Sequence, residues 1–200
     1  MNKILITGSA GFIGSNLLRD LYPYNKVFII LRKKLNAKDP INKYKNIKII
    51  YYSKFDDLNK KLKTLRVDIV IHCATHYIKN HSYKDLLELN KSNILFGNII
   101  LENLKIMRTK KFINFSTVWE DYNSIKDNSF NLYSVYKKCF SSLINHYLNI
   151  LPKINFYNLM ISDTFGVFDK RLKIINILKK NYKSNKTTKI ISKNLFLNLI

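Results

Sequence analysis

The sequence predicts an α/β fold in which helices cover both faces of a doubly wound parallel sheet. Short apolar runs come in near alternation with longer segments of helical periodicity. The short runs are apolar at nearly every position, which is typical of strands buried on both faces. A chain of 200 residues, 46% of them hydrophobic, is long enough to bury a core around such a sheet.

Each element has its own signal along the chain. Apolar runs predict strands over 3–7, 26–31, 47–52, 67–71, 111–116 and 154–161. The first helix follows the first strand and ends before Pro23, because proline cannot continue a helix. Helical spacing predicts further helices over 58–65, 83–105, 133–149 and 171–183. No linker or repeat interrupts this order, so we expect residues 1–165 to form one domain and residues 166–200 to begin another region.

The strongly basic composition raises the question of a nucleic-acid partner. The chain has 35 Lys and Arg against 13 Asp and Glu, a net charge of +22. Lysine far outnumbers arginine, however, and arginine is preferred for bidentate contacts to bases and phosphates. Lys, Asn, Ile, Tyr and Phe are abundant together, as A/T-rich codons would produce. We therefore expect no nucleic-acid partner, and salt-dependent binding to random DNA would contradict this.

The sequence also bears on compartment and metals. No apolar run approaches the roughly 18–20 residues that span a bilayer, and MNKILITGSAGFIG is no secretory signal. We expect a cytoplasmic protein that does not contact membranes. Cys73 and Cys139 lack CxxC spacing and are expected to be reduced core residues. His72, His76 and His81 have no carboxylate or cysteine at ligand spacing, so no metal site is expected.

The stretch LITGSAGFIGSNLL places Gly8, Gly11 and Gly14 three residues apart between a strand and a helix. Such glycines allow a tight turn, a close approach of the backbone to a pyrophosphate and close packing of helix on strand. This is the dinucleotide-binding turn of a Rossmann-like fold. The segment resembles the extended short-chain dehydrogenase/reductase family, whose signature is TGxxGFIGxxL. The resemblance implies that these residues contact the cofactor: Thr7, Gly8, Ala10, Gly11, Phe12, Ile13 and Gly14.

The end of the second strand bears on which cofactor is bound. An acidic residue there would bind a ribose 2′-hydroxyl, whereas this chain has Leu31-Arg32-Lys33-Lys34. Arginine is scarce in the chain, which makes Arg32 informative. Because cations suit a 2′-phosphate, we expect NADP(H), with NAD(H) as the alternative.

A second motif, Tyr133-Ser-Val-Tyr-Lys137, predicts the catalytic pair. Positions i and i+4 share a helix face, and a nearby ammonium lowers the pKa of a phenol, which makes it a usable acid or base. Ser116-Thr117 ends the preceding strand, and this order matches the Ser/Thr, Tyr and Lys of the family. The expected catalytic residues are Thr117, Tyr133 and Lys137. Ser116 is the fallback for Thr117, whose role is to hydrogen-bond the reacting oxygen.

Other positions match the family more loosely. HCAT, after the fourth strand, resembles the family's HxA segment, which implies that Cys73, Ala74 and Thr75 line the cofactor. Asn93 begins NILFGN, which resembles the NvxGT helix, and it is also expected at the cofactor. Asp56, or its neighbour Asp57, stands after the third strand, where the family contacts adenine.

The later segments indicate a branch of the family. DTFGVFDKR resembles the family's NxYGPxDxR, where the substrate domain starts. Together with STVWEDYN and NLYSVYK, it resembles NADPH-dependent reductases of the CDP-abequose and CDP-paratose synthase type. The resemblance implies reduction of the 4-keto group of a CDP-linked deoxysugar for bacterial surface polysaccharide, such as lipopolysaccharide O-antigen. It also implies substrate contacts from Ser116, Trp119, Asp163 and Arg171.

Alternatives stay open at this point. KIISKNLFLNLI ends where a further strand should begin, so the substrate domain is expected to be incomplete. The chain would then be a truncated, non-catalytic dinucleotide-binding protein. An epimerase or dehydratase on the same scaffold is the other alternative. A dehydratase needs an acidic pair beside the hydroxyl residue, whereas Val118-Trp119 separates Thr117 from Glu120-Asp121. The helices over 83–105 and 133–149 are candidates for a homodimer interface.

Overall fold

The structure is a computed structural model that describes residues 1–189 except 37, 168, 170 and 172. It divides into two compact units, residues 1–160 and the residues from 161 on. This division lies close to the predicted boundary at residue 165. The strand expected in the closing stretch KIISKNLFLNLI falls almost wholly on residues 190–200, outside the described residues.

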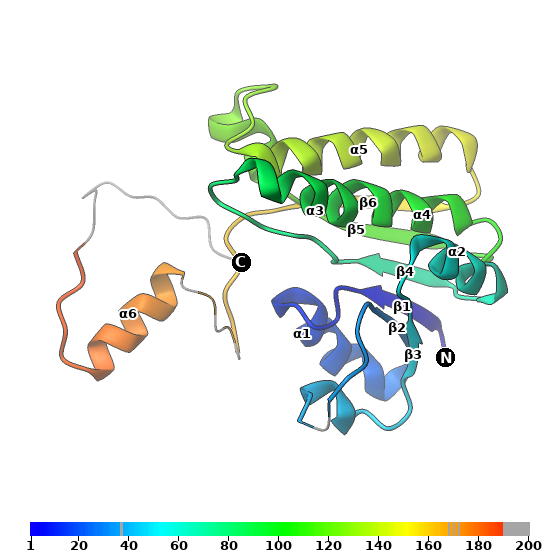
Figure 1. Cartoon of the computed structure of the whole chain (residues 1–200), viewed down its shortest axis with the longest axis horizontal. Coiled ribbons are helices and arrows are strands. Elements are labelled where there is room, and N and C mark those ends of the chain that lie inside the picture. Colours follow the sequence, from blue (N-terminus) through cyan, green and yellow to red (C-terminus); the bar gives the residue numbers. More distant parts are fainter. Residues whose placement is uncertain (37, 168, 170, 172, 190–200) are drawn as a thin grey trace. The chain divides into compact units, whose positions relative to one another are not determined.

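A six-stranded sheet with the order β3-β2-β1-β4-β5-β6 forms the centre of the first unit (Figure 1). Every pair whose register is defined is parallel. The strand order reverses between β1 and β4, and ligands bind at such a switch point in doubly wound sheets. The predicted α/β class is therefore confirmed. The strands are β1 (Lys3–Thr7), β2 (Lys26–Leu31), β3 (Lys48–Tyr51), β4 (Ile69–His72), β5 (Lys111–Thr117) and β6 (Asn155–Ile161).

The helices follow the predicted order with one irregularity. The segment predicted as one helix over 83–105 contains a π-turn, η4 (Lys91–Leu95), between α3 and α4. Short 3-10 segments include η2 (Pro40–Lys43), which follows β2, and η5 (Val118–Ser124), which follows β5. The α-helices are α1 (Phe12–Leu21), α2 (Phe55–Thr64), α3 (Leu86–Asn90), α4 (Phe96–Asn103), α5 (Leu132–Ile150) and, in the second unit, α6 (Ile174–Lys183).

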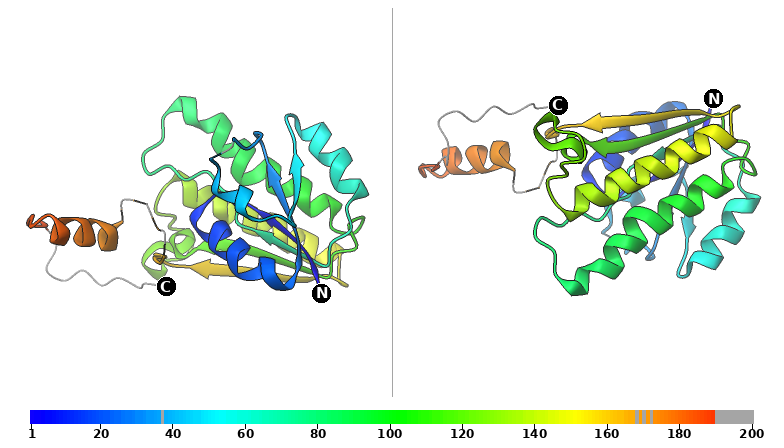
Figure 2. Two further views of the ribbon diagram at one scale, coloured as in Figure 1. Left: turned by 90° about the horizontal axis from the view of Figure 1, so that it is seen from below. Right: turned by 90° about the horizontal axis from the view of Figure 1, so that it is seen from above.

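The two faces of the sheet carry separate hydrophobic clusters because side chains alternate along each strand. Leu5 and Phe28 belong to a cluster with residues of α2, α4 and α5, and Figure 2 shows these helices side by side over the sheet. Ile4 and Ile29 belong to the opposite cluster, which α1 and η2 cover. Both faces of the central strands are therefore buried, as their continuous apolar runs predict.

Two expectations about burial are wrong. The run 154–161 reads as a buried strand, yet β6 is the last strand of the sheet order and exposes Tyr157, Leu159 and Met160. Cys139 was expected in the core, but it is exposed because the buried stripe of α5 passes through Phe140, one position later. Cys73 is half-buried. Among the described helices, none is long and apolar enough to cross a membrane.

Candidate functional site

The glycine loop forms a cradle between β1 and α1 that leaves no room for a side chain at Gly8 or Gly14. Gly8 has φ +69°, and a Cβ there would lie 2.6 Å from the backbone nitrogen of Ala74. A Cβ on Gly14 would lie 2.2 Å from the Gly8 carbonyl oxygen, so helix and loop are in direct backbone contact. At Gly11 the nearest atom to a Cβ is that same oxygen, at 3.2 Å. Gly8 and Gly14 are therefore required for the conformation of the loop. Gly11 leaves the exposed surface of the loop without a side chain.

The N-terminus of α1 opens from this loop. Gly11 is its N-cap, and the first turn contains no acidic side chain. The positive end of the helix dipole is thus not neutralised locally, which favours a phosphate. Ala10 and Gly11 are exposed, while Phe12 and Ile13 begin the helix half-buried. These residues fit the pyrophosphate of a dinucleotide, which they would bind through backbone N–H groups.

Thr7 and the residues after β4 form the opposite wall of the cradle. Thr7 and His72 are register partners, and Thr7 Oγ1 lies 2.9 Å from His72 Nδ1. The Ala74 N–H donates to the same hydroxyl at 3.2 Å. Burial holds the pKa of His72 at about 3, with Lys137 as a second cause, so the imidazole is neutral. Thr7 therefore joins the two strand ends rather than offering a free hydroxyl.

The start of α5 positions the predicted catalytic pair, Tyr133 and Lys137. The Asn131 side chain accepts from the Ser134 N–H, and the Ser134 hydroxyl accepts from the Asn131 N–H, which forms a capping box. The cap places Tyr133 in the first turn and Lys137 one turn later on the same face. Lys137 is only 3% exposed. Burial lowers the pKa of Lys137 to about 8, against the opposing effects of Glu120 and Cys73.

The phenol of Tyr133 differs from the sequence expectation. The motif predicted a pKa lowered by Lys137, whereas burial raises the pKa of Tyr133. A hydrogen bond with Thr75 opposes this rise, and Tyr77 and Glu120 add to it. The phenol is consequently held in its protonated form, ready to donate a proton.

Asn93 positions the loop that contacts Tyr133. It lies buried in the π-turn, where its side-chain oxygen accepts from the Thr75 hydroxyl at 3.0 Å and from the His76 N–H at 2.7 Å. Its amide group donates to the His76 carbonyl at 3.0 Å. The side chain expected at the cofactor therefore clamps the loop after β4 and fixes Thr75 beside Tyr133.

Aromatic rings surround the exposed side of Tyr133. Tyr77 meets Tyr133 edge-on, with ring centroids 5.1 Å apart, and lies 6.2 Å from Trp119. Trp119 packs on Phe130 at 5.1 Å. The predicted substrate residue Trp119 thus contacts Tyr133 through Tyr77, a residue that the sequence does not predict at the site. No local pattern distinguishes Tyr77 among the many tyrosines of the chain.

The two hydroxyl residues at the end of β5 have different surroundings. Thr117 Oγ1 accepts from the Trp119 N–H at 3.3 Å and caps η5. Ser116 is buried and donates to the Glu120 carboxylate. Thr117 keeps its proton for another acceptor, whereas Ser116, the fallback and predicted substrate contact, is directed to Glu120. Glu120 is 4% exposed, and the sequence does not predict its burial at this site.

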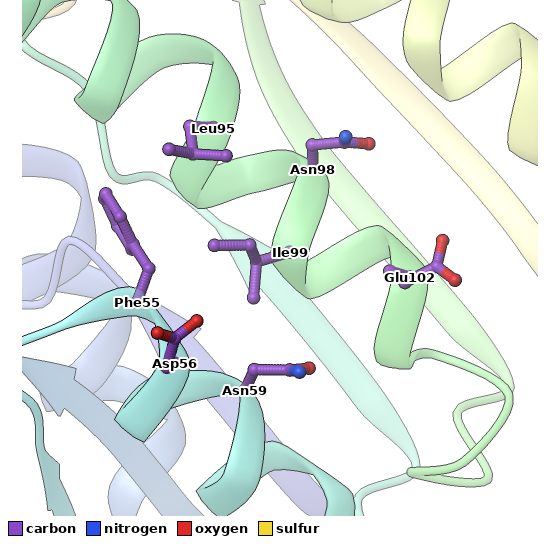
Figure 3. Close-up of a pocket in the computed structure, with 7 residues that line it drawn as sticks. All are labelled: Phe55, Asp56, Asn59, Leu95, Asn98, Ile99 and Glu102. Atoms are coloured by element: carbon purple, nitrogen blue, oxygen red, sulfur yellow. The ribbon is translucent and has the colours of Figure 1, made fainter.

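The two residues expected at the adenosine end, Arg32 and Asp56, lie on different elements, after β2 and on α2. Arg32 forms an ion pair with Glu88, and its side chain is 61% exposed. The Ser92 hydroxyl also donates to Glu88, at 2.9 Å. Asp56 lies on α2 at a cavity of about 460 Å³ between α2 and the α4 side, beside Phe55 and facing Ile99 (Figure 3). No residue of the glycine loop lines that cavity.

Asp163 and Arg171 belong to the second unit. There Asp163 pairs with Lys173, while Arg171 pairs with Asp169 at 2.8 Å and donates to the Thr164 carbonyl at 2.6 Å. Both predicted substrate residues therefore have partners within their own unit. No group of metal-ligating side chains occurs among the described residues.

Comparison with known proteins assigns the chain to a family. The model described as "NAD dependent epimerase/dehydratase family" matches residues 4–195. The chain belongs to this family. Relatives include CDP-abequose synthases from Salmonella muenchen, 28% identical over 92% of this chain, and from Yersinia pseudotuberculosis, 29% identical over 99%. The chain spans 60% and 68% of their respective lengths.

A solved epimerase has the same fold. The UDP-glucuronic acid 4-epimerase of Bacillus cereus superposes with a TM-score of 0.76 at 23% identity, over 92% of this chain and 64% of that one. At this identity the likeness supports the fold alone. The glycine loop follows β1 of the sheet, and Tyr133 and Lys137 lie on α5, which comes after β5 along the chain.

Proposed function

We propose that the chain carries out NADPH-dependent reduction of the 4-keto group of a nucleotide-linked deoxysugar, with CDP as the expected nucleotide. The product would serve bacterial surface polysaccharide synthesis in the cytoplasm. The observation that carries the proposal is the similarity to two CDP-abequose synthases along 92% and 99% of this chain. Dimerisation through the α3–α4 segment and α5 stays a prediction of the sequence.

The residues at the site suit a reduction. A bound nicotinamide cofactor would supply the hydride to the carbonyl carbon. Tyr133 then donates its phenolic proton to the carbonyl oxygen, so the carbonyl becomes a hydroxyl and the phenol becomes a phenolate. The Lys137 ammonium stabilises that phenolate, and Thr117 hydrogen-bonds the reacting oxygen. The raised pKa of Tyr133 supports this direction, because the proton is present before the reaction begins.

The preference for NADPH rests on Arg32. Its guanidinium is exposed at the end of β2, and Lys33 and Lys34 follow it. The Arg32 guanidinium forms an ion pair with Glu88, so a 2′-phosphate would compete with that carboxylate for it. An exposed ion pair contributes only about 0–1 kcal/mol, so a 2′-phosphate can replace Glu88 at the guanidinium at little cost in free energy. NADH remains the alternative cofactor.

An epimerase or dehydratase is the second candidate, because the family name covers both. A dehydratase would need an acid beside Thr117. Glu120 instead accepts hydrogen bonds from Ser116 and Ser141, which favours the reductase.

The first test is a titration of the 200-residue chain with NADPH and NADH, followed by nicotinamide fluorescence. We expect tighter binding of NADPH, and oxidation of NADPH when a CDP-linked 4-keto deoxysugar is added. Tyr133→Phe should retain cofactor binding and lose turnover by a factor of about 100 or more. Binding without turnover would favour the non-catalytic alternative. No binding by the folded chain would overturn the proposal.

A further inference from the structure

A buried carboxylate is hydrogen-bonded to α5, the helix that carries Tyr133 and Lys137. Glu120 follows β5 and is 4% exposed. The Ser116 hydroxyl donates to its Oε1, and the Ser141 hydroxyl lies 3.1 Å from the same atom. The Ser129 hydroxyl donates to the Glu120 carbonyl at 2.9 Å. Neutral donors thus hold the carboxylate in one place, but they do not balance its charge.

The Lys137 ammonium is buried close to this network. Ser141 stands one turn after Lys137 on α5, and its hydroxyl lies 3.1 Å from the Lys137 carbonyl oxygen. Asn158 donates to the Ser141 hydroxyl at 2.9 Å, which ties the network to β6. Within the described part of the chain Lys137 makes no ion pair. Two opposite charges therefore share a buried layer without direct contact, and low polarity strengthens their attraction through space.

The other titratable groups around Lys137 are neutral near pH 7. Burial raises the pKa of the Cys73 thiol to about 12 and lowers that of His72 to about 3. Tyr133 keeps its proton, as described above. Around Glu120, the remaining charges are Asp121 and Lys138, which pair with each other at 2.6 Å. Burial raises the pKa of Glu120 itself, and Ser141 and Lys137 oppose that rise. When ionised, Glu120 is the negative charge that acts on Lys137 among the described residues.

We propose that Glu120 is a positioning residue that keeps Lys137 protonated in its buried site. The carboxylate offsets part of the cost of burying the ammonium, and the ammonium stabilises the ionised carboxylate in return. The use of this charge in turnover rests on the proposed function. The electrostatic coupling itself does not, because it depends only on the folded chain.

The test is an NMR titration of the Lys137 side chain with 13Cε-labelled lysine, in the absence of cofactor. Lys137→Arg identifies the signal. Glu120→Gln retains an oxygen that accepts from Ser116 and Ser141, but it removes the charge. We expect it to lower the measured pKa of Lys137 by about one or more. Glu120→Asp should restore most of the pKa, and Asp121→Asn, the matched control, should leave it unchanged.

The unsubstituted chain offers a second measurement that needs no variant at Glu120. Ionisation of Glu120 should appear at acid pH as a small second step in the Lys137 signal. A Lys137 pKa that stays the same in folded Glu120→Gln, or a signal with no second step, would overturn the inference. A coupled pKa in a chain that binds no nicotinamide nucleotide would refute the proposed function while leaving the inference intact.

Discussion

At the scale of single residues, the protonation of buried groups gives the most direct tests. His72 is neutral when folded, with its pKa lowered to about 3 from 6.5. The unfolded chain therefore binds the proton more tightly between these values, so stability is lost as the pH falls from 6.5 towards 3. We expect this group to cost on the order of 4 kcal/mol over that range.

Urea unfolding of His72→Gln and the unsubstituted chain at pH 7, 5 and 4 checks this expectation. The difference in unfolding free energy between the two proteins should shrink as the pH falls, since glutamine does not titrate. His146→Gln is the matched control, because His146 is exposed on α5. A difference that is independent of pH would contradict a neutral His72.

Arg32 and Glu88 make a second residue-scale pair. Arg32→Ala should weaken NADPH binding about 10-fold or more and change NADH binding little, because only NADPH carries the 2′-phosphate. Glu88→Gln should strengthen NADPH binding a few-fold by releasing the guanidinium. Fluorescence titration measures both effects, and Arg19→Ala, an exposed arginine paired with Asp20, is the control. Equal losses for the two nucleotides would exclude a phosphate-specific role.

At the scale of elements, the glycine loop and α1 can pack together only because Gly14 has no side chain. A Cβ on Gly14 would lie 2.2 Å from a backbone oxygen that cannot move without opening the loop, whereas on Gly11 the distance is 3.2 Å. Gly14→Ala should lower the unfolding free energy by about 1–3 kcal/mol and abolish cofactor binding. The Gly11→Ala variant should fold with near-normal stability, but it should bind the cofactor more weakly than the unsubstituted chain does. Thermal melts with nucleotide titrations separate the two, and equal stability would contradict the contact.

The π-turn gives a second prediction at this scale. Asn93→Ala removes three hydrogen bonds and leaves buried groups of the loop after β4 without partners. The expected cost is about 2–3 kcal/mol. Asn93→Asp keeps both acceptor contacts, and it should cost less. Denaturant unfolding orders the three proteins, and hydrogen exchange at the His76 amide should quicken in the alanine variant. An unchanged exchange rate would mean that Asn93 is not a clamp.

The elements also show which features of the structure can be predicted from the sequence alone. Strand positions and the glycine loop were predictable, because apolar runs and glycine spacing are local signals. The exposure of β6 was not, because an edge strand and a central strand have similar apolar runs. The π-turn left no pattern, since it changes the register of a helix without changing its composition. Glu120 is adjacent to the predicted site, yet neither its burial nor its hydrogen bond with Ser141, 21 residues later, can be read from the local sequence.

At the scale of the whole molecule, the net charge of +22 dominates. Like charges repel in the compact state, and salt screens this repulsion over about 8 Å at physiological ionic strength. Raising NaCl from about 50 to about 500 mM shortens the Debye length roughly threefold. The weaker repulsion should raise the melting temperature by about 2–4 °C. Scanning fluorimetry measures it, with sucrose at equal osmolality as the control. A melting temperature that falls with salt would show that ion pairs outweigh the repulsion.

The π-turn between α3 and α4 has one further consequence, for changes in chain length. A π-turn holds one more residue than the α-helical turn it replaces. Removal of one residue from 91–95 would therefore convert the segment to a regular helix, and Gly97 would still face Phe140. The same deletion inside α5, before Phe140, would rotate every later residue by about 100° about the helix axis and turn Phe140, Ile144 and Tyr147 out of the core. Along these two neighbouring helices, only the first has a place where the chain can shorten without losing its packing.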